Sequence, residues 1–177
     1  MVAAAGQVLW HVSENPGISR FEPRENPAAH SQESLVWAID DAHVPAYWFP
    51  RDVPRGTWWA TEQTTDDDVD RFLGGDRALR VHAIQREWLD EFRSGRIYAY
   101  RFPTETFEPY DATAGYYVSS VAIEPAEVIE LTDLERLHAE RGIELRVVDD
   151  LAAVWDNVIA STVDFSGIRL RNLDRRT

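Results

Sequence analysis

Residues 36–59 bring together the side chains of this chain that are best suited to hold a ligand. The segment VWAIDDAHVPAYWFPRDVPRGTWW contains four of the seven Trp, the run Tyr47–Trp48–Phe49, and the pair Arg51 and Arg55. Aromatic rings stack on flat ligands, and Arg guanidinium groups form paired hydrogen bonds with carboxylate or phosphate oxygens. The segment therefore predicts a site for a flat, anionic or heteroaromatic ligand, although the same composition also fits an aromatic core with a structural ion pair.

The two Arg residues of this segment divide the interpretations most sharply. Pro50 and Pro54 fix two backbone φ angles and stiffen the turn expected to carry Arg51 and Arg55. Rigid donors suit phosphate recognition, whereas buried pairing with a nearby Asp suits fold stability. We expect a division of roles, with Arg55 structural and Arg51 facing a cavity.

The residue inventory excludes several kinds of chemistry. The chain has no Cys, which rules out disulfides, thiolate metal sites and Cys nucleophiles. All 18 basic residues are Arg, which removes Schiff-base chemistry and a P-loop lysine. The chain contains no GxSxG, GxGxxG, Walker A or HExxH motif, and the five His show no metal-ligand spacing. We therefore expect no metal site.

The formal charge of −13 argues against binding to a phosphate backbone, so nucleic acid is an unlikely partner. The N-terminal residues have no basic region followed by an apolar stretch, and no run of apolar residues is long enough to span a membrane. We expect a soluble protein in the cytoplasm that makes no membrane contact.

Hydrophobic patterns predict an α+β fold with a bent, largely antiparallel sheet or sheets and three to four helices. A single domain is expected over residues 1–177, with a core over 8–172, a long loop over 14–33 and a tail over 173–177. About eight short strands are predicted at 8–12, 35–39, 57–60, 79–84, 96–102, 116–123, 128–131 and 144–148. Helices are predicted at 66–73, 86–93, from Thr132 to Gly142, and at 150–161, where Leu151, Val154, Trp155 and Val158 form one apolar stripe.

Four motifs resemble a family of bacterial proteins of unknown function. They are LWHVSENPGISRFEPR, VWAIDDAHVPAYWFPRDVPR, TFEPYDATAGYYVS and WDNVIASTVDFSGIRLRN, which together cover nearly all of residues 8–172. The resemblance implies membership of that family and brings no established activity.

The chain also shows a remote resemblance to the ADP-ribosyltransferase fold. In that fold, a His on the first strand holds the ribose of NAD, a later Tyr stacks on nicotinamide, and a Glu that opens a further strand polarises the reacting ribose. His11 in LWHVS is similar to the first element, and Trp37 followed by a short helix that reaches Tyr47 is similar to the second. At the position of the Glu the chain has Gly115, and the substitutes to consider are Glu105, Glu108 or Asp111 from a neighbouring loop.

Together these observations predict a pocket for a nucleotide or NAD-like ligand. Its expected lining residues are His11, Ser13, Trp37, Tyr47, Arg51, Arg55 and Tyr116. If a reaction takes place, the resemblance implies glycosyl transfer or hydrolysis, with His11, Tyr47 and Glu105 as catalytic candidates and an NAD-like nucleotide as cofactor. The alternative is a non-catalytic module that binds a protein partner through an exposed patch of Trp48, Trp58 and Trp59.

Overall fold

The computed structural model describes residues 6–25, 33–75, 78–111 and 113–176. Its α-carbon contacts divide the chain into two compact units, each of which is made from two separate stretches. Unit 1 comprises Met1–Trp48 and Arg96–Leu131, and unit 2 comprises Phe49–Gly95 and Thr132–Thr177. Each unit has its own sheet, and the mixture of helices with mainly antiparallel strands confirms the predicted α+β class.

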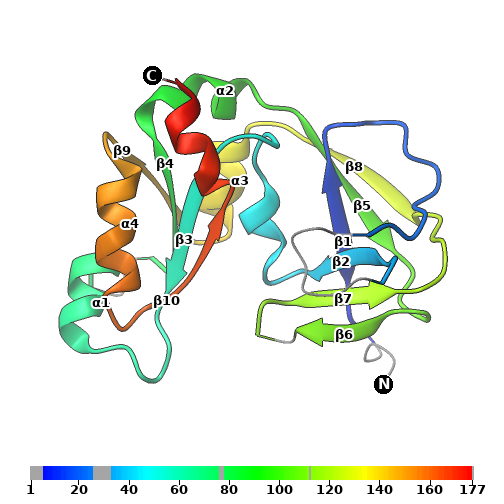
Figure 1. Cartoon of the computed structure of the whole chain (residues 1–177), viewed down its shortest axis with the longest axis horizontal. Helices are drawn as coiled ribbons and strands as arrows, with labels where there is room; N and C mark the ends of the chain where they lie inside the picture. The colour runs from blue at the N-terminus through cyan, green and yellow to red at the C-terminus, as the bar shows by residue number, and fades with distance from the viewer. Residues whose placement is uncertain (1–5, 26–32, 76–77, 112, 177) are drawn as a thin grey trace. The chain divides into compact units, whose positions relative to one another are not determined.

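Six strands form the sheet of unit 1 (Figure 1). In chain order they are β1 (Leu9–Ser13), β2 (Val36–Asp40), β5 (Ile97–Phe102), β6 (Glu108–Asp111), β7 (Tyr116–Ser119) and β8 (Glu127–Leu131). Their order in space is β6-β7-β2-β1-β5-β8, and neighbouring strands are antiparallel. β1 lies in the interior of the sheet, and β2 lies beside it. A short 3-10 helix, η1 (Val44–Tyr47), follows β2.

One face of this sheet carries the core of unit 1. Alternation along β5 places Tyr98, Tyr100 and Phe102 on that face, as the sequence pattern predicted, and they pack with Leu9 of β1. The long loop contributes Phe21, which forms a backbone bridge with Ile123 and covers the same core. Of the loop expected at 14–33, residues 26–32 lie outside the described residues.

Four strands form the sheet of unit 2, in the order β10-β3-β4-β9. They are β3 (Arg55–Trp59), β4 (Arg80–Gln85), β9 (Ile143–Val148) and β10 (Asp164–Ile168). β4 and β9 pair in parallel, and the other two pairs are antiparallel. The helices of unit 2 are α1 (Asp66–Leu73), α2 (Leu89–Ser94), α3 (Leu134–Glu140) and α4 (Leu151–Ile159), with 3-10 turns η2 (Arg86–Trp88) and η3 (Leu170–Arg176).

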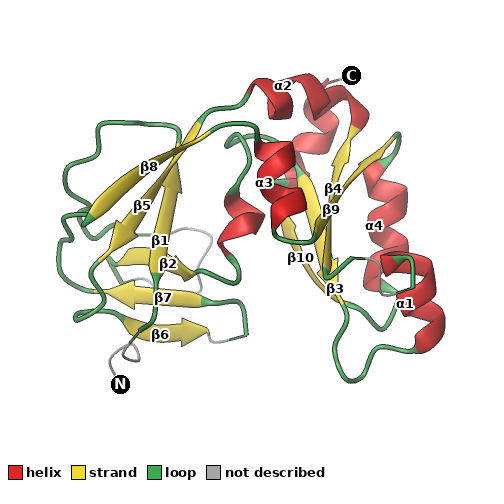
Figure 2. Ribbon diagram, turned by 180° about the vertical axis from the view of Figure 1, so that it is seen from behind, coloured by secondary structure: helices red, strands yellow, loops and turns green. Residues whose placement is uncertain are grey.

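Helices cover both faces of the unit 2 sheet. Figure 2 shows α1 and α4 against one face and α3 against the other. The predicted apolar stripe of α4 is confirmed: Leu151 and Val158 are buried against Trp58, while Val154 and Trp155 are partly buried at the margin of the same cluster. Burial of one such aliphatic side chain contributes about 1.5–3 kcal/mol, so this stripe is a main reason why the helix docks.

Two glycines make room for the indole of Trp155. A Cβ at Gly56 would lie 2.8 Å from Trp155 Cε3, and a Cβ at Gly167 would lie 2.9 Å from Trp155 Cζ2. Gly56 and Gly167 are paired directly across β3 and β10. The ring of Trp155 therefore lies against backbone where other residues would place a side chain.

Local sequence signals explain where the helices begin. Thr65 caps α1 by accepting from the N–H of Asp68, and Asp150 caps α4 by accepting from the N–H of Ala153. The helix expected from Thr132 begins two residues later, because α3 starts at Leu134 after Asp133, whose φ is 51°, and Thr132 and Glu135 form no capping box. Instead of turning back to the helix start, the Glu135 carboxylate accepts from Arg93 Nε at 3.1 Å.

Two strands were not predicted. β6 has an exposed and proline-containing sequence, EPYD, with no apolar alternation to indicate a strand. β10 includes Ser166 and Gly167, residue types that are common in turns. The chain continues from β10 into η3, where Leu170 packs on the core. Pairing with β3 supplies the strand character that the local sequence of β10 lacks.

Candidate functional site

The residues predicted to line one pocket belong to both units. Unit 1 contains His11, Ser13, Trp37, Tyr47 and Tyr116, and unit 2 contains Arg51 and Arg55.

Within unit 1, strand register separates two of the predicted residues from the rest. Directly paired residues on antiparallel strands point to the same face of a sheet. His11 pairs with Tyr100 and Ser13 with Tyr98, so both lie on the core face. Trp10 lies on the other face and pairs with Ile39 of β2. Trp37 is two residues before Ile39 on the same strand, so its side chain lies on that face as well. Tyr116 also pairs with Ile39 and so joins Trp37 on this second face.

His11 and Ser13 have structural partners on the core side. The ring of His11 lies 4.8 Å from that of Phe21 between centroids, and its Nδ1 donates to the carbonyl of Trp37 at 3.2 Å. Ser13 Oγ accepts from the backbone N–H of Asn15 at 3.2 Å, which shapes the start of the long loop. These contacts fix β1 and the loop that follows it.

Trp37, Tyr47 and Tyr116 converge on the second face of the sheet. The ring centroids of Trp37 and Tyr116 are 6.0 Å apart in an edge-to-face arrangement, and Tyr110 of β6 lies 4.7 Å from Trp37 in the same manner. The hydroxyls of Tyr47 and Tyr116 are hydrogen-bonded at 2.5 Å. Trp37, Tyr47 and Tyr116 are each partly buried, and they come from β2, the end of η1 and β7. We call Trp37, Tyr47, Tyr110 and Tyr116 the aromatic corner.

An Asp–His pair that was not among the predicted site residues lies at the end of β2, packed against Gly115. Asp40 ends β2 and His43 is the N-cap residue of η1. Asp40 Oδ1 accepts from His43 Nδ1 at 2.7 Å and from the backbone N–H of His43 at 2.9 Å. The side chains are 15% and 20% exposed, respectively, so the pair is largely enclosed. The signal that was available was an Asp and a His three residues apart at the end of a strand.

Gly115 makes this arrangement possible. A Cβ at this position would lie 2.3 Å from His43 Nδ1 and 2.9 Å from Asp40 Cγ. Its φ of +72° is also one that residues with side chains rarely adopt. The carbonyl of Gly115 accepts from the N–H of Asp40 at 2.9 Å, which ties the start of β7 to the end of β2. Because Gly115 has no side chain, the Asp40–His43 pair occupies the space where a Cβ at this position would lie.

The ionisation of Asp40 determines the chemistry of the pair. Burial raises the pKa of Asp40, but the hydrogen bonds from the ring and backbone of His43 lower it, and the net pKa lies below the usual value. An ionised Asp40 can only accept, so Nδ1 of His43 carries a proton and donates it. In a neutral imidazole with Nδ1 protonated, Nε2 is an acceptor. No hydrogen bond to Nε2 is formed by any described residue.

Of the carboxylate candidates, Glu105 lies in a turn, and Glu108 and Asp111 are the first and last residues of β6. Glu105 is exposed in the turn that links β5 to β6, where Phe107 N–H donates to the carbonyl of Thr104 at 3.1 Å. Asp111 accepts from the N–H groups of Thr113 and Ala114 and so shapes the turn before Gly115. Neither takes the place that a carboxylate at position 115 would have.

The two Arg residues differ in exposure. Arg51 lies in an exposed turn of unit 2. Arg55 is 3% exposed and opens β3, where it was expected in the turn. Its guanidinium lies 4.9 Å from the ring centroid of Phe49, and its Nη1 donates to the carbonyl of Val53 at 3.0 Å. Arg55 is thus part of the interior of unit 2.

Two buried His side chains lie on the same face of the unit 2 sheet as Arg55. The rings of His82 in β4 and His138 in α3 are 5.0 Å apart between centroids, and both contact Phe49. Burial lowers the pKa of His138 to about 4, and burial together with the charges of His138, Arg80 and Arg55 lowers the pKa of His82 well below its usual value. Both rings are therefore neutral at physiological pH.

Trp48, Trp58 and Trp59 do not form the exposed patch that was predicted to bind a protein partner. Trp48 is 7% exposed and Trp58 is fully buried, with its Nε1 donating to the carbonyl of Phe72 at 3.0 Å. Trp59 is partly buried, and the guanidinium of Arg80 lies 4.1 Å from its ring centroid. Two of these three rings, Trp48 and Trp58, are therefore part of the interior.

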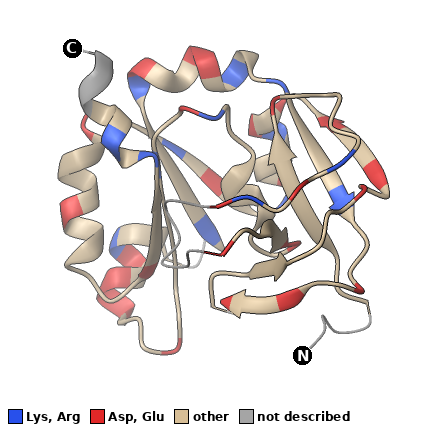
Figure 3. Ribbon diagram, turned by 45° about the vertical axis from the view of Figure 1, so that its right-hand side comes forward, with Lys and Arg blue, Asp and Glu red and all other residues tan. Residues whose placement is uncertain are grey.

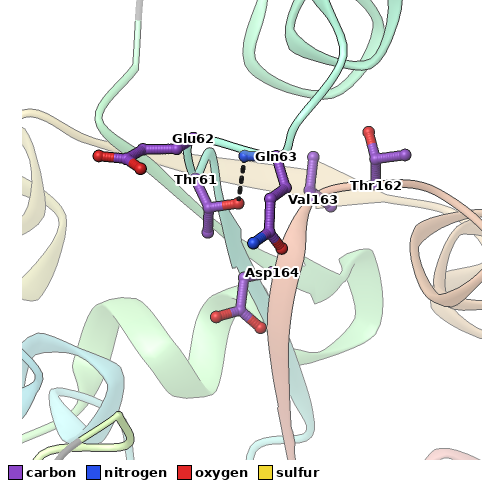
Figure 4. A pocket seen from close by; sticks show the side chains of 6 residues that line it. All are labelled: Thr61, Glu62, Gln63, Thr162, Val163 and Asp164. Atoms are coloured by element: carbon purple, nitrogen blue, oxygen red, sulfur yellow. Dashed lines mark hydrogen bonds between the residues drawn. The ribbon is translucent and has the colours of Figure 1, made fainter.

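An open groove of about 500 Å³ lies elsewhere in unit 2 (Figure 4). Its lining residues are Thr61, Glu62, Gln63, Thr162, Val163 and Asp164. Thr162 is already engaged, because Asp68 Oδ2 accepts from both its hydroxyl and its backbone N–H. The groove has no aromatic lining residue, so it lacks the stacking surface expected for a planar ligand.

Acidic and basic residues are interspersed along both units (Figure 3). Across the part of the chain that the structure describes, no group of three or more His, Asp or Glu could hold a metal ion. None of the helices within the described ranges has both the length and the apolar character needed to cross a membrane.

Sequence comparison assigns the chain to a family. The family model described as "Family of unknown function (DUF6886)" matches residues 10–173. The chain belongs to this family. The match includes residues of both units, in agreement with the resemblance that the sequence motifs carry to a family without an assigned activity. No curated protein and no solved structure matches the chain.

Proposed function

We propose that unit 1 binds a nucleotide-like small molecule and places a planar ring of that ligand at the aromatic corner, on an ADP-ribosyltransferase-like scaffold. The observation that carries the proposal is the convergence of Trp37, Tyr47 and Tyr116 from three separate segments on one face of the sheet. A few polar groups among aromatic side chains are the usual composition of a small-molecule site.

A buried donor in the aromatic corner supports the same proposal. The indole Nε1 of Trp37 is buried, and no described residue accepts its hydrogen bond. A buried N–H without an acceptor costs about 1–3 kcal/mol. A carbonyl or ring nitrogen of a planar ligand would supply the missing acceptor.

Three predicted residues, His11, Ser13 and Arg55, are left out of the proposed site, and a fourth, Arg51, has a separate role. His11 and Ser13 point to the core face, away from Trp37 and Tyr116. Arg55 is interior to unit 2, whereas Arg51 is exposed there and is retained as a proposed anion contact of that unit.

We propose that unit 1 binds the ligand and does not catalyse glycosyl transfer. Glycosyl transfer of the kind implied by the sequence resemblance would use a carboxylate at position 115, and the Asp40–His43 pair leaves no space there for a side chain. The alternative, a protein-binding surface built on Trp48, Trp58 and Trp59, has no support because two of the three rings are buried.

Ligand titrations followed by amide NMR test the proposal. We expect NAD, ADP-ribose or AMP to shift the resonances of residues 37–47 and 115–117, with smaller changes at residues 61–63 and 162–164 of the groove. Tyr116→Phe and Trp37→Leu should weaken binding by about tenfold each, the effect of losing one well-formed contact. Tyr98→Phe is the matched control, because Tyr98 lies on the opposite face and its hydroxyl donates to Glu130.

The outcome that contradicts the proposal is equally specific. Shifts confined to the groove, or binding that Tyr116→Phe and Tyr98→Phe weaken to the same extent, would place the ligand elsewhere. The absence of any shift with all three nucleotides would remove nucleotide binding by unit 1 altogether.

A further inference from the structure

The sheet of unit 1 has two edges, and one of them is open to the addition of a further strand. At the first edge, β6 contains Pro109, which has no N–H to donate, and its register with β7 shifts between Pro109 and Asp111. Both features hinder pairing with another strand. At the second edge, β8 pairs with β5 over its whole length from Glu127 to Leu131, without a register shift and without proline (Figure 2). β8 is therefore the regular edge of this sheet.

The edges of the unit 2 sheet are less open than β8. β9 is buried or partly buried along its whole length, whereas all residues of β8 except Leu131 are exposed. In β10, the N–H of Phe165 already donates to the side chain of Asp164 at 2.9 Å. Proteins protect edge strands by such devices, because unpaired backbone groups bind other strands. β8, which is described in full, shows none of the protections found at the other three edges.

Two apolar side chains of β8 are exposed, one on each face of the sheet. Val128 is 44% exposed and pairs directly with Tyr100, so it lies on the face that carries the core. Ile129 is 36% exposed and pairs with Ala99, which places it on the opposite face. A strand paired with β8 would cover both side chains, because directly opposite residues of neighbouring strands share a face and contact each other.

Two glutamates flank these apolar residues and make the edge acidic. Glu127 Oε2 accepts from Arg101 Nε at 2.8 Å, and Glu130 Oε1 accepts from Arg96 Nη1 at 2.7 Å. The second oxygen of each carboxylate accepts no hydrogen bond from any described residue. Each carboxylate can therefore accept from an additional cation, and the net charge of −13 favours association with a basic partner.

We propose that β8 is a docking edge for an extended segment of a basic partner protein, which adds to the sheet of unit 1 as a further strand. The segment that fits has the order basic, apolar, apolar, basic, because each face of β8 then receives one apolar contact and one ion pair. Main-chain hydrogen bonds along the edge provide affinity, and the side chains determine which segments bind. β1 and β5 separate β8 from the strands of the aromatic corner, so this docking goes beyond the function proposed above.

A second copy of the chain fits this edge less well than a basic partner does. Pairing β8 with β8 of a second copy would bring together two strands that carry the same two glutamates. Each copy also has a formal charge of −13, so the two copies repel each other as they approach.

Synthetic peptides test the proposal on the unmodified protein. In amide NMR titrations at low ionic strength, the peptide acetyl-Thr-Arg-Val-Val-Arg-Thr-amide should shift the resonances of residues 127–131. Its counterpart with Glu in place of both Arg should bind at least about tenfold more weakly, because two opposite-charge pairs become like-charge pairs. The Arg peptide N-methylated at both Val residues should shift none of these resonances, since it keeps the side chains but loses main-chain donors.

Variants then connect the selectivity to β8. With Glu127→Gln and Glu130→Gln combined, the ratio of affinities between the Arg and Glu peptides should fall below about threefold. The matched control combines Glu105→Gln with Glu108→Gln, which removes the same charge in the turn before β6 and at the start of β6. This control should retain the ratio of the parent protein. Far-UV circular dichroism establishes that each variant is folded.

Several results would overturn the proposal. The absence of any shift with the Arg peptide, or shifts confined to residues other than 127–131 and their partners 97–101, would do so even if no variant folds. Equal binding of the Arg and Glu peptides would exclude selection of a basic partner, and binding of the N-methylated peptide would mean that no strand is added. A dimer in sedimentation equilibrium, with concentration-dependent shifts at residues 127–131 in the absence of peptide, would assign the edge to a second copy instead.

Discussion

Mild acid should destabilise unit 2 through two histidines that it buries in neutral form. His138 has no exposed surface, and its pKa falls from 6.5 to about 4 on folding. His82 is equally enclosed, both of its ring nitrogens lack a hydrogen-bond partner among the described residues, and burial lowers its pKa well below the usual value. The groups whose positive charge opposes protonation are Arg55 and Arg80, on β3 and β4.

The direction of the effect follows from proton binding. Above pH 6.5 both rings are neutral whether the chain is folded or unfolded, so the contribution to stability is fully present. Between pH 6.5 and about 4 the unfolded chain binds protons that the folded chain does not. The free energy of unfolding therefore decreases as the pH is lowered through this range. For His138 the loss reaches about 3 kcal/mol, at roughly 1.4 kcal/mol per pH unit, and His82 adds to it in the same direction.

Urea unfolding at a series of pH values, followed through amide resonances of β3, β4 and β9, measures this loss. The matched variant is His82→Leu with His138→Leu, which removes both titrating groups and keeps apolar volume in the core. We expect the parent to lose at least about 3 kcal/mol more than the double variant between pH 7 and pH 4. Equal losses in the two proteins would refute the reasoning, because the acid sensitivity would then come from groups other than these rings.

Other perturbations separate the structural roles described above. Trp155→Ala should lower the free energy of unfolding by about 3 kcal/mol in urea denaturation, because it removes a ring packed over Gly56 and Gly167; a change near zero would show that α4 is peripheral. Arg55→Gln should cost roughly 3–5 kcal/mol and Arg51→Gln under about 0.5 kcal/mol in the same assay, since only Arg55 is buried; equal costs would contradict this division. Gly115→Ala should lower the melting temperature and shift the NMR signals of His43, with an expected cost of about 1–3 kcal/mol from strain alone; an unchanged melting temperature would mean that the β7 turn can move away from Asp40.

Local patterns predicted most of the secondary structure, because those elements are determined by their own sequences. The alternation of Tyr98, Tyr100 and Phe102 with smaller side chains, and the stripe of Leu151 and Val158, each identify a buried face directly. β6 and β10 could not be recognised in this way, since their strand conformation comes from pairing with β7 and β3 rather than from apolar alternation.

The candidate site was less accessible to sequence reasoning than the elements that carry it. Tyr47, Tyr116 and Trp37 were selected for their ring chemistry and do converge. The face on which His11 lies depends on the register of β1 with β5, which involves residues about ninety positions apart. The Asp40–His43 pair is enclosed because Gly115, which is distant in the sequence, packs against it. The sequence shows that an Asp and a His are three residues apart, but it does not show this packing.

The order in which the chain visits its two units has a consequence for biosynthesis. The backbone passes between the units three times, after residues 48, 95 and 131. During translation, β1 emerges long before its partner β5, and β3 and β4 emerge before the α4 that covers Trp58. Neither unit can be completed by a contiguous nascent segment, so both must remain partly open on the ribosome until residues 131 and beyond have been added. Excising either unit as a fragment would therefore require joining two stretches with a new linker, not simply choosing a boundary.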